Sequence, residues 1–332
     1  MKFAVLGAGR IGRVHAGAIG SVTGAELVAV ADAMPAAAED LAQLHGAEVR
    51  TIDQIAAADD VDAVVICTPT DMHADLIEQF VRAGKAVFCE KPIDLDLGRV
   101  RDCLAVVEET GGMLMVGFNR RYDPDFAALH AAVADGRVGT VEMVTITSRD
   151  PGAPPLDYIA RSGGIFRDMT IHDFDIARWM LGEEVETVIA SASVLTDPAI
   201  GEAGDFDSLN VILRTASGKQ ATITNSRRAT YGYDQRIEVH GSEGMANARN
   251  MHEANIEIAD AKGYHRPPLE NFFMTRYTAA YAHEIATFVG CVRDGKAPPT
   301  GGYDGMMALA LADAAVKSVA EGRAVQMAEI LA

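Results

Sequence analysis

The N-terminal glycine run constrains the fold of this chain more than any other feature. Lys2 to Leu6 is a short apolar run that ends in Gly7-Ala8-Gly9-Arg10-Ile11-Gly12, and a helical stretch follows from about Ile11 to Ile19. Glu26 to Ala31 (ELVAVA) predicts a second strand, which ends at Asp32. Strand, glycine loop, helix, strand and acidic residue follow one another in the order that dinucleotide binding requires.

Each glycine of the loop has a separate physical task. Gly7 permits the tight turn, Gly9 lets a pyrophosphate approach the main chain, and Gly12 lets the helix pack closely on the strand. The N-terminus of the helix offers N–H groups and partial positive charge to the phosphates, and Arg10 can contact a phosphate as well. We therefore expect these three glycines, Arg10 and Ile11 to bind the cofactor.

The acidic residue at the end of the second strand indicates which dinucleotide binds. Asp32 follows about 20 residues after Gly12, the usual spacing for the ribose-binding carboxylate. A carboxylate in this place accepts hydrogen bonds from the adenosine ribose hydroxyls and repels a 2′-phosphate. The sequence therefore predicts NAD rather than NADP, although Arg10 could still contact a phosphate.

Strands and helices continue to alternate over the first third of the chain. We expect strands at Ala63–Cys67, Ala86–Cys89 and Met113–Gly117, and helices at about His73–Ala83 and Asp96–Glu109. This alternation predicts a parallel, doubly wound sheet. In such sheets ligands bind outside the carboxyl ends of the strands, where Thr68, Lys91 and Asn119 follow.

Lys91 lies between Glu90 and Pro92 just after one of these strands. The proline biases Lys91 toward extended geometry, so its ammonium group can project from the strand end toward a cleft. The alternative is a surface lysine paired with Glu90.

The pattern changes after the segment Asn119–Pro124. A helix is expected at about Asp125–Asp135, a strand at Val141–Ser148 and a loop at Asp150–Gly164; further strands at Val185–Val194, Ser208–Thr215, Gln220–Ser226 and Arg236–His240 precede helices at about Arg276–Arg293 and Tyr303–Glu321. Consecutive strands with few helices between them predict a large mixed or antiparallel sheet. We expect two domains, residues 1–119 and 120–332.

Asp168 and His172 are the strongest candidates for chemistry in the second part. If the segment from Asp168 to Trp179 is one helix, positions i and i+4 share a face, so the carboxylate and the imidazole point the same way. An unperturbed histidine pKa of about 6.5 suits a base that removes a hydroxyl proton near neutral pH. Asp168 would orient the imidazole, and Lys91 would hold the substrate oxygen. The alternative is a structural histidine bonded to Asp168 or Asp175.

The histidine and carboxylate residues of this segment allow two other interpretations, a metal site and a hydrolase. Asp168, His172, Asp173 and Asp175 could bind a divalent ion, but neighbours on a helix such as His172 and Asp173 point about 100° apart. A further ligand such as His240 or His252 has no diagnostic spacing. No G-x-S-x-G occurs, so a nucleophile elbow is not indicated. We expect no metal.

Composition limits the partners and the compartment. The formal net charge of −18 argues against binding to nucleic acids or anionic membranes, which favour basic patches. None of the four cysteines forms a C-x-x-C pair, which fits a reducing compartment. The chain enters its first strand at once, without a signal-peptide pattern, and no apolar run approaches about 18 residues. A cytoplasmic protein is expected.

The motifs together resemble the glucose–fructose oxidoreductase/inositol dehydrogenase family. The resemblance rests on the glycine loop with His15, on Cys67-Thr68-Pro69 with His73, on Glu90-Lys91-Pro92 and on the segment Asp168–Trp179, in this order. It implies an N-terminal Rossmann domain and a C-terminal α+β domain whose open sheet mediates formation of a homotetramer. It also implies NAD-dependent oxidation of a ring hydroxyl to a ketone.

The same resemblance assigns roles to individual residues. It implies cofactor contacts at Thr68, Pro69, His73, Glu90 and Lys91, and catalytic roles for Lys91, Asp168 and His172. It places an arginine of the substrate pocket at Arg120 and a pocket tyrosine at Tyr233, with Tyr231 as the alternative. Asn119 and Asp150 would also face the substrate, and both differ from the residues common in similar proteins.

The stretches Gly117–Pro124 and Gly163–Asp173 most resemble bacterial inositol dehydrogenases. The expected reaction is oxidation of myo-inositol to 2-keto-myo-inositol (scyllo-inosose), with His172 as the general base. The alternatives are scyllo-inositol or an aldose such as glucose or galactose as substrate, and an NADP-dependent dihydrodiol dehydrogenase or imine reductase, against which Asp32 counts. A non-catalytic NAD-binding regulator would not need Lys91, Asp168 and His172 together.

Overall fold

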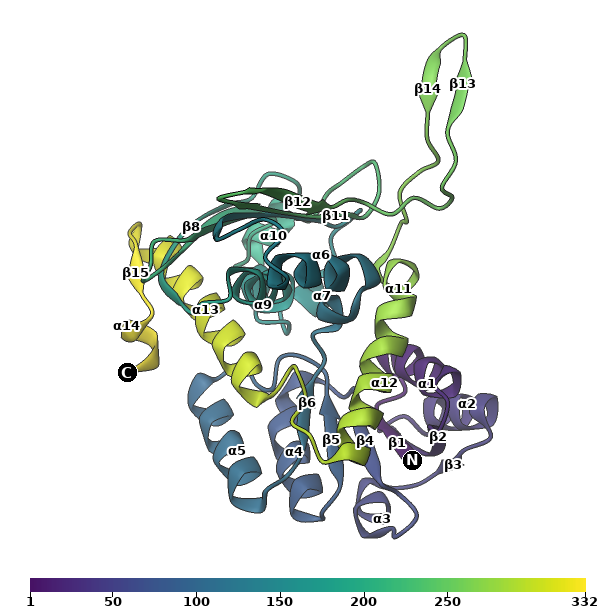
Figure 1. Ribbon diagram of the computed structural model, residues 1–332. Coiled ribbons are helices and arrows are strands. Elements are labelled where there is room, and N and C mark those ends of the chain that lie inside the picture. The colour runs from purple at the N-terminus through teal and green to yellow at the C-terminus, as the bar shows by residue number, and fades with distance from the viewer. The chain divides into compact units, whose positions relative to one another are not determined.

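The computed structural model describes residues 1–332, and the chain divides into two compact units (Figure 1). Unit 1 consists of Met1–Tyr122 and Thr278–Leu309, and unit 2 consists of Asp123–Tyr277 and Ala310–Ala332. The predicted ranges, 1–119 and 120–332, did not include the return of the chain to unit 1 near its C-terminal end.

The returning segment belongs to unit 1 because helix α12 (Thr278–Asp294) supplies part of its core. The ring of Phe288 lies 6.2 Å from that of Phe3 and 5.9 Å from that of Phe88. Tyr281, which lies on the same helix, packs edge-on against His15. Hydrophobic periodicity predicts that such a helix has a buried face, but not which sheet it covers.

Unit 1 contains a six-stranded parallel sheet in the order β3-β2-β1-β4-β5-β6. The strands are β1 (Lys2–Leu6), β2 (Glu26–Ala31), β3 (Glu48–Val49), β4 (Ala63–Ile66), β5 (Ala86–Cys89) and β6 (Leu114–Val116). The order reverses between β1 and β4, which creates the switch point at which doubly wound folds bind ligands. The predicted Rossmann sheet is thus confirmed.

The helices of unit 1 are α1 (Arg10–Ser21), α2 (Pro35–His45), α3 (Ile52–Ala57), α4 (His73–Arg82), α5 (Leu97–Thr110), α12 and the start of α13 (Gly302–Glu321), with short 3-10 turns η1 (Thr70–Met72) and η2 (Asn119–Tyr122). Local signals set several of their ends. Thr51 and Gln54 form a reciprocal capping box at α3, and Asp96 accepts a hydrogen bond from the Arg99 N–H at α5, so the first turns have hydrogen-bond partners.

Unit 2 contains a seven-stranded mixed sheet in the order β12-β11-β7-β10-β9-β8-β15. The strands are β7 (Val141–Arg149), β8 (Val185–Ser193), β9 (Ser208–Thr215), β10 (Gln220–Ser226), β11 (Asp234–Gly241), β12 (Gly244–Ala248) and β15 (Val325–Gln326). The pair β7–β10 is parallel and the others are antiparallel. This confirms the predicted large mixed sheet.

Helices cover one face of this sheet (Figure 1). They are α6 (Pro124–Ala134), α7 (Leu156–Ile159), α8 (Gly164–Asp168), α9 (Thr170–Leu181) and α10 (Pro198–Glu202). The short helix α11 (Phe273–Arg276) directly precedes α12, and α14 (Ala328–Leu331) is the last helix. Buried and exposed residues alternate along β9 and β10, as expected for strands with one packed face. The other face carries no helix.

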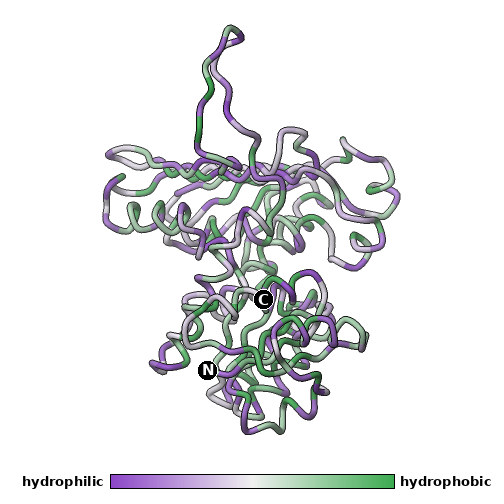
Figure 2. The backbone as a smooth tube through the Cα atoms, turned by 90° about the vertical axis from the view of Figure 1, so that its right-hand side faces the viewer, coloured by the Kyte–Doolittle hydropathy of each residue, from purple (hydrophilic) through white to green (hydrophobic).

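A two-stranded hairpin of β13 (Ile258–Asp260) and β14 (Gly263–His265) projects from unit 2. Its strands are exposed, and hydrophilic and hydrophobic segments alternate along it (Figure 2). The sequence pattern did not predict these short strands. No helix of the chain has the length and apolar character needed to cross a membrane.

Candidate active site

The glycine loop has the backbone geometry that its sequence predicts. Gly7 has φ +97°, and a Cβ there would lie 2.5 Å from the carbonyl oxygen of Cys67. A Cβ on Gly12 would lie 1.8 Å from the carbonyl oxygen of Gly7. Both positions therefore require glycine, because any side chain would strike the main chain of the loop or of the strand beside it.

Gly9 differs from these two glycines. It caps the N-terminus of α1, and a Cβ there would meet nothing within 4 Å. The space beside it is open, so the fold itself does not require glycine at this position. A cradle next to the first turn of a 12-residue helix fits a pyrophosphate, which needs close contact with main-chain N–H groups. Arg10 and Ile11 begin the helix, as expected.

Asp32 fixes the same loop from the end of β2. Its Oδ2 accepts a hydrogen bond from the Ala8 N–H at 2.6 Å, and its Oδ1 accepts one from the Met34 N–H at 2.7 Å. The predicted ribose-binding carboxylate is therefore also a structural link between the glycine loop and the second strand.

His73 joins the ends of β4 and β5. The imidazole is buried, its Nδ1 lies 2.7 Å from the carbonyl oxygen of Pro92 and its Nε2 lies 2.9 Å from that of Thr68. The Lys91–Pro92 peptide bond is cis. The side chain of His73 thus connects the segment of Thr68 and Pro69 to the segment that carries Lys91.

Lys91 is half-buried and follows β5 directly. The neighbouring Glu90 places its carboxylate against the imidazole of His15, with 2.6 Å between Oε1 and Nε2. The main-chain N–H of Glu90 donates to the carbonyl oxygen of Ile66 at 3.0 Å, which aligns the end of β5 with β4. Asn119 and Arg120, at the start of η2 after β6, are both buried.

The segment of Asp168 and His172 in unit 2 differs from the expected single helix. Asp168 is the last residue of α8, whereas His172 lies in the first turn of α9, and Met169 separates the two helices. The Oγ1 of Thr170 donates to the carbonyl oxygen of Ile165 and to the side chain of Asn225 on β10. These bonds fix the junction, so the two side chains are not related by an uninterrupted helical turn.

The carboxylate of Asp168 is held by residues that the sequence analysis missed. The Tyr158 hydroxyl donates to its Oδ1 at 2.9 Å, and a guanidinium nitrogen of the fully buried Arg227 lies 3.9 Å from its Oδ2. Arg227 also lies 3.2 Å from Oδ2 of Asp205. The Oδ1 of Asp205 accepts a hydrogen bond from the Ile165 N–H at the start of α8. No sequence spacing links these positions.

The alternative ligands for a metal in unit 2 have other partners. Asp173 accepts a hydrogen bond from Asn225 at 2.8 Å. His240 faces Glu142 on the sheet at 3.6 Å, and Nδ1 of His252 lies 2.7 Å from the carbonyl oxygen of Pro267. These contacts favour structural roles for the three side chains.

The remaining candidates for substrate contacts also lie in unit 2. Asp150 directly follows β7, and its N–H donates to the carbonyl oxygen of Ser226 at 2.9 Å. Tyr233 is buried, with its ring edge-on against Tyr277 at 5.9 Å. Tyr231, the alternative, is exposed, and its hydroxyl donates to Asp234 at 2.6 Å.

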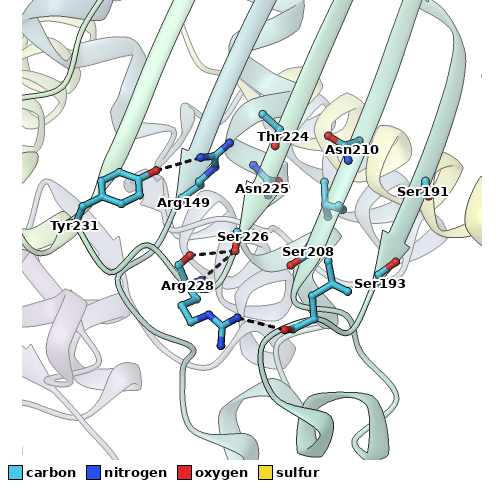
Figure 3. A pocket seen from close by; sticks show the side chains of 12 residues that line it. Arg149, Ser191, Ser193, Ser208, Asn210, Thr224, Asn225, Ser226, Arg228 and Tyr231 are labelled. Carbon is cyan, nitrogen blue, oxygen red and sulfur yellow. Dashed lines mark hydrogen bonds between the residues drawn. The ribbon is translucent and has the colours of Figure 1, made fainter.

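The helix-free face of the sheet in unit 2 contains a shallow polar pocket of about 300 Å³ (Figure 3). It is lined by Arg149, Ser191, Ser193, Leu195, Ser208, Leu209, Asn210, Thr224, Asn225, Ser226, Arg228 and Tyr231. Arg149 donates to the Tyr231 hydroxyl at 3.1 Å. The predicted catalytic residues are not among the lining residues, so this pocket is a feature of the open face.

Comparison with known proteins decides the family. Residues 1–118 match the family described as "Oxidoreductase family, NAD-binding Rossmann fold", and residues 126–247 match the "GFO/IDH/MocA C-terminal domain". The chain is 67 % identical over 328 residues to the inositol 2-dehydrogenase of Rhizobium meliloti, and the aligned region covers 99 % of each chain. The chain belongs to the GFO/IDH/MocA oxidoreductase family. The resemblance stated from the motifs is confirmed.

Solved structures of GFO/IDH/MocA proteins have the same fold. The myo-inositol dehydrogenase of Corynebacterium glutamicum is 44 % identical, with a TM-score of 0.95 and coverage of 98 % of each chain. The scyllo-inositol dehydrogenase of Lactobacillus casei, solved with bound NAD(H) and scyllo-inositol, is 28 % identical, with a TM-score of 0.92 and 99 % coverage of each chain. NAD is the cofactor of the chain described here. The open space beside Gly9 fits the pyrophosphate of NAD.

Proposed function

We propose that this family member oxidises myo-inositol to 2-keto-myo-inositol with NAD as the acceptor. The observation that carries the proposal is the identity of 67 % to an inositol 2-dehydrogenase over nearly the whole of both chains. The resemblance of their motifs to those of the family supports Lys91, Asp168 and His172 as the catalytic residues in this proposal. Scyllo-inositol is the second candidate substrate, because a relative named scyllo-inositol 2-dehydrogenase from Bacillus subtilis is 37 % identical.

NAD, when bound, supplies the acceptor for the hydride that leaves the ring carbon. The glycine loop would hold its pyrophosphate at Gly9 and the first turn of α1, while Asp32 would accept hydrogen bonds from the ribose hydroxyls. The same carboxylate would repel the 2′-phosphate of NADP. Thr68, Pro69 and His73 would shape the end of β4 next to the cofactor.

The proton of the hydroxyl group needs a separate acceptor, and His172 takes that role in the proposal. Its imidazole would remove the proton as the carbon–oxygen bond gains double-bond character. Asp168 would orient the ring and stabilise its cation. Because Tyr158 and Arg227 hold the Asp168 carboxylate, little reorganisation would be needed during the reaction. Lys91 would donate a hydrogen bond to the reacting oxygen.

The proposal assigns substrate recognition to four further polar side chains. Asn119, Arg120, Asp150 and Tyr233 would bond the remaining ring hydroxyls. A site that forms hydrogen bonds to each hydroxyl rejects an epimer strongly, because a mismatched group leaves a buried partner unpaired. In this proposal, substrate choice among inositols and aldoses depends mainly on Asn119 and Asp150.

The decisive experiment is a substrate panel monitored by NADH formation at 340 nm. Purified protein is supplied with NAD or NADP and with myo-inositol, scyllo-inositol, D-chiro-inositol, glucose, galactose or xylose. The proposal expects the highest kcat/KM with myo-inositol and NAD. Turnover of another polyol alone would be consistent with the proposed mechanism but would contradict myo-inositol as the substrate. NAD binding without turnover of any compound would favour a non-catalytic regulator.

Two variants test the assigned roles. Lys91→Ala should retain NAD binding and lose most turnover, whereas a regulator would be unaffected. His172→Ala should lose turnover across pH 7–10. If the His172 variant kept near wild-type rates over that range, another group would be the base.

We also propose a cytoplasmic homotetramer that assembles through the helix-free face of the unit 2 sheet. Ile189 and Ile212 are opposite each other on β8 and β9, and Met143 and Met245 lie on the same face. These four side chains are 43–51 % exposed. Exposed apolar side chains on a helix-free sheet face are typical of an interface, and a second copy of the chain is the partner that closed symmetry supplies.

A further inference from the structure

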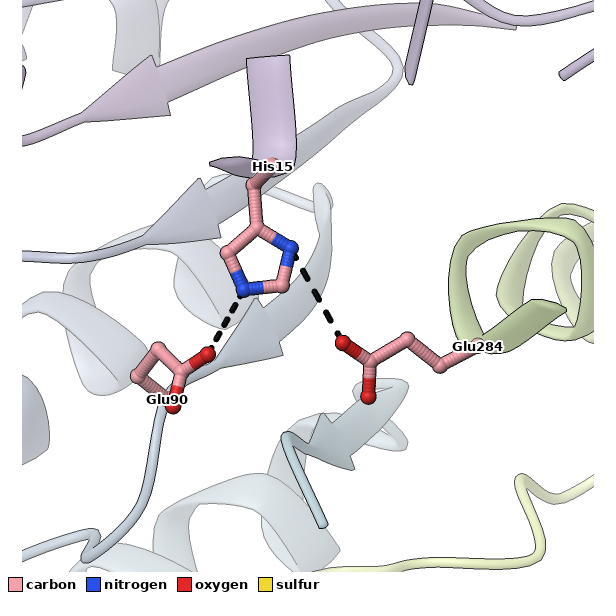
Figure 4. A group of neighbouring side chains, drawn as sticks. All are labelled: His15, Glu90 and Glu284. Atoms are coloured by element: carbon pink, nitrogen blue, oxygen red, sulfur yellow. Dashed lines mark hydrogen bonds and ion pairs between the residues drawn. The ribbon is translucent and has the colours of Figure 1, made fainter. Parts of the chain in front are cut away.

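Three titratable side chains meet in the interior of unit 1, next to the residue that precedes Lys91 (Figure 4). His15 lies on α1, Glu284 on α12, and Glu90 at the end of β5. The side chains of His15 and Glu284 are fully buried, and that of Glu90 is 12 % exposed. The catalytic scheme proposed above uses neither His15 nor Glu284.

The imidazole lies between the two carboxyl groups. Its Nε2 is 2.6 Å from Oε1 of Glu90, and its Nδ1 is 3.9 Å from Oε1 of Glu284. A metal ion would bind through one ring nitrogen, yet the two carboxyl groups face different nitrogens, as Figure 4 shows. The 2.6 Å contact also leaves no room for an ion with bonds of about 2.0 Å to each ligand. The geometry therefore does not favour a metal site: the imidazole is hydrogen-bonded to Glu90 through Nε2, and the carboxyl group of Glu284 lies beyond hydrogen-bonding distance of Nδ1.

Aromatic contacts fix the ring of His15 in this orientation. Phe88 packs against it at 5.0 Å between centroids, and Tyr281 packs edge-on at 5.5 Å with an interplanar angle of 85°. Gly117 leaves room for the Glu90 carboxyl group, because an added Cβ there would lie only 3.2 Å from Cδ of Glu90.

Burial determines which member of the group carries the proton. Burial raises the pKa of Glu284 well above its usual value, and the negative charge of Glu90 raises it further. Burial therefore favours the neutral carboxylic acid form of Glu284. A neutral acid beside Nδ1 allows Nε2 of His15 to carry the hydrogen that binds Glu90. A charge-assisted hydrogen bond of this kind is about twice as strong as a neutral one.

We propose that His15 and Glu284 are positioning residues that hold the Glu90 carboxylate as an anion at the carboxyl end of β5. There its charge favours the cationic, oxidised nicotinamide over the neutral, reduced form. The proposal deepens the NAD-dependent oxidation proposed above and rests on it for the identity of the redox couple.

The topology supports the placement of Glu90 near the nicotinamide half of the dinucleotide. The carboxyl ends of β1, β4 and β5 are neighbours in the sheet, and the glycine loop follows β1. A dinucleotide with its pyrophosphate on that loop and its adenosine ribose at Asp32 on β2 extends in the other direction, toward β4 and β5. Glu90 is the acidic residue at the end of β5.

The test measures dissociation constants rather than turnover. NADH is titrated by its fluorescence, NAD by competition with NADH, both at pH 7 without any polyol. Glu90→Gln and His15→Leu should each lower the preference for NAD over NADH about tenfold, which corresponds to about 1.4 kcal/mol. His15→Gln, which keeps a donor near the Nε2 position, should recover most of the preference. Glu284→Gln, a mimic of the neutral acid, should stay within about twofold of wild type, whereas Glu284→Leu should lower the preference about threefold.

Glu109→Gln is the matched control, because Glu109 is exposed on α5 of the same unit. An unchanged preference in Glu90→Gln would overturn the electrostatic role of Glu90. A shift in Glu90→Gln together with a control-like value in His15→Leu would overturn the positioning role. If His15→Leu fails to fold, His15→Gln and Glu284→Leu decide the same point. Because no polyol is present, loss of the inositol assignment would leave these binding ratios unaffected.

Discussion

The Tyr158 hydroxyl donates a hydrogen bond to Oδ1 of Asp168 over 2.9 Å. Tyr158 lies on α7, a single helical turn within the segment that the sequence predicted as a loop. A proposed catalytic carboxylate at the end of one short helix is thus oriented by a side chain from another. The arrangement predicts that removal of the hydroxyl alone will affect catalysis.

Tyr158→Phe should lower kcat about fivefold to tenfold, because a hydrogen bond to a charged group contributes roughly 1.5 kcal/mol or more. The KM for NAD should remain within twofold, since the loop that binds the cofactor lies in unit 1. Initial rates with saturating polyol and variable NAD provide both constants. Tyr264→Phe, on the exposed hairpin, is the control. Equal kcat values for the two variants would show that Tyr158 does not orient Asp168.

The buried guanidinium of Arg227 supports the same carboxylate in a different way. Arg227→Met would leave Asp205 and Asp168 without their buried cation, so the free energy of unfolding should fall by about 3–5 kcal/mol. Denaturant titration followed by circular dichroism measures this change. Arg228→Met is the matched control, because Arg228 is the next residue but is exposed, and its guanidinium donates to the carbonyl oxygens of Leu195 and Thr196. Similar losses in both variants would contradict a special role for Arg227.

Gly9 and Gly12 should separate cofactor binding from folding. Gly9→Ala adds a methyl group into open space, so stability should stay near wild type while the affinity for NAD falls at least about tenfold, a loss of about 1.4 kcal/mol. Gly12→Ala drives a methyl group against the carbonyl oxygen of Gly7, so it should lower the melting temperature. Calorimetric titration with NAD and thermal unfolding distinguish the two. Normal NAD affinity in Gly9→Ala would place the pyrophosphate elsewhere.

If the helix-free face of the unit 2 sheet is the interface between subunits, a charged residue on that face should lower the oligomeric state. Ile212→Asp places a charge beside Ile189 on the proposed interface, and burial of an unpaired carboxylate is strongly unfavourable. The variant should elute as a smaller species than the proposed wild-type tetramer in size-exclusion chromatography with light scattering. Leu44→Asp, an exposed apolar residue on α2 in unit 1, should leave the mass unchanged. An unaltered mass for Ile212→Asp would move the interface to another surface.

The sequence predicted most of the helices and strands and the backbone geometry of the glycine loop, because these depend on local patterns. The bounds of β9 and β10 agree with the prediction, since apolar residues at every second position are a strong strand signal. The break at Met169 was missed because no proline or glycine marks it. The partners of Asp168 were missed for another reason: Tyr158, Asp205 and Arg227 meet only through tertiary packing, which no spacing encodes.

Glu284 illustrates the same limit and provides a test by pH. Its position on α12 gives no sign that it faces His15 on α1, near the other end of the chain. Burial and then the charge of Glu90 raise its pKa in the folded protein, whereas the unfolded chain has a glutamate pKa of about 4.3. The folded state therefore holds a proton that the unfolded state has lost once the pH exceeds about 4.3.

The stability contributed by this proton is complete below the unfolded pKa and is lost as the pH rises toward the folded pKa. Across that window the free energy of unfolding should decrease by about 1.4 kcal/mol per pH unit on account of Glu284. Glu284→Gln keeps a neutral group and removes the titration. The melting temperature of the variant, measured from pH 5 to pH 9, should therefore rise relative to wild type as the pH increases. Glu109→Gln should run parallel to wild type. A constant difference between Glu284→Gln and wild type would mean that Glu284 has the same charge in the folded and unfolded states.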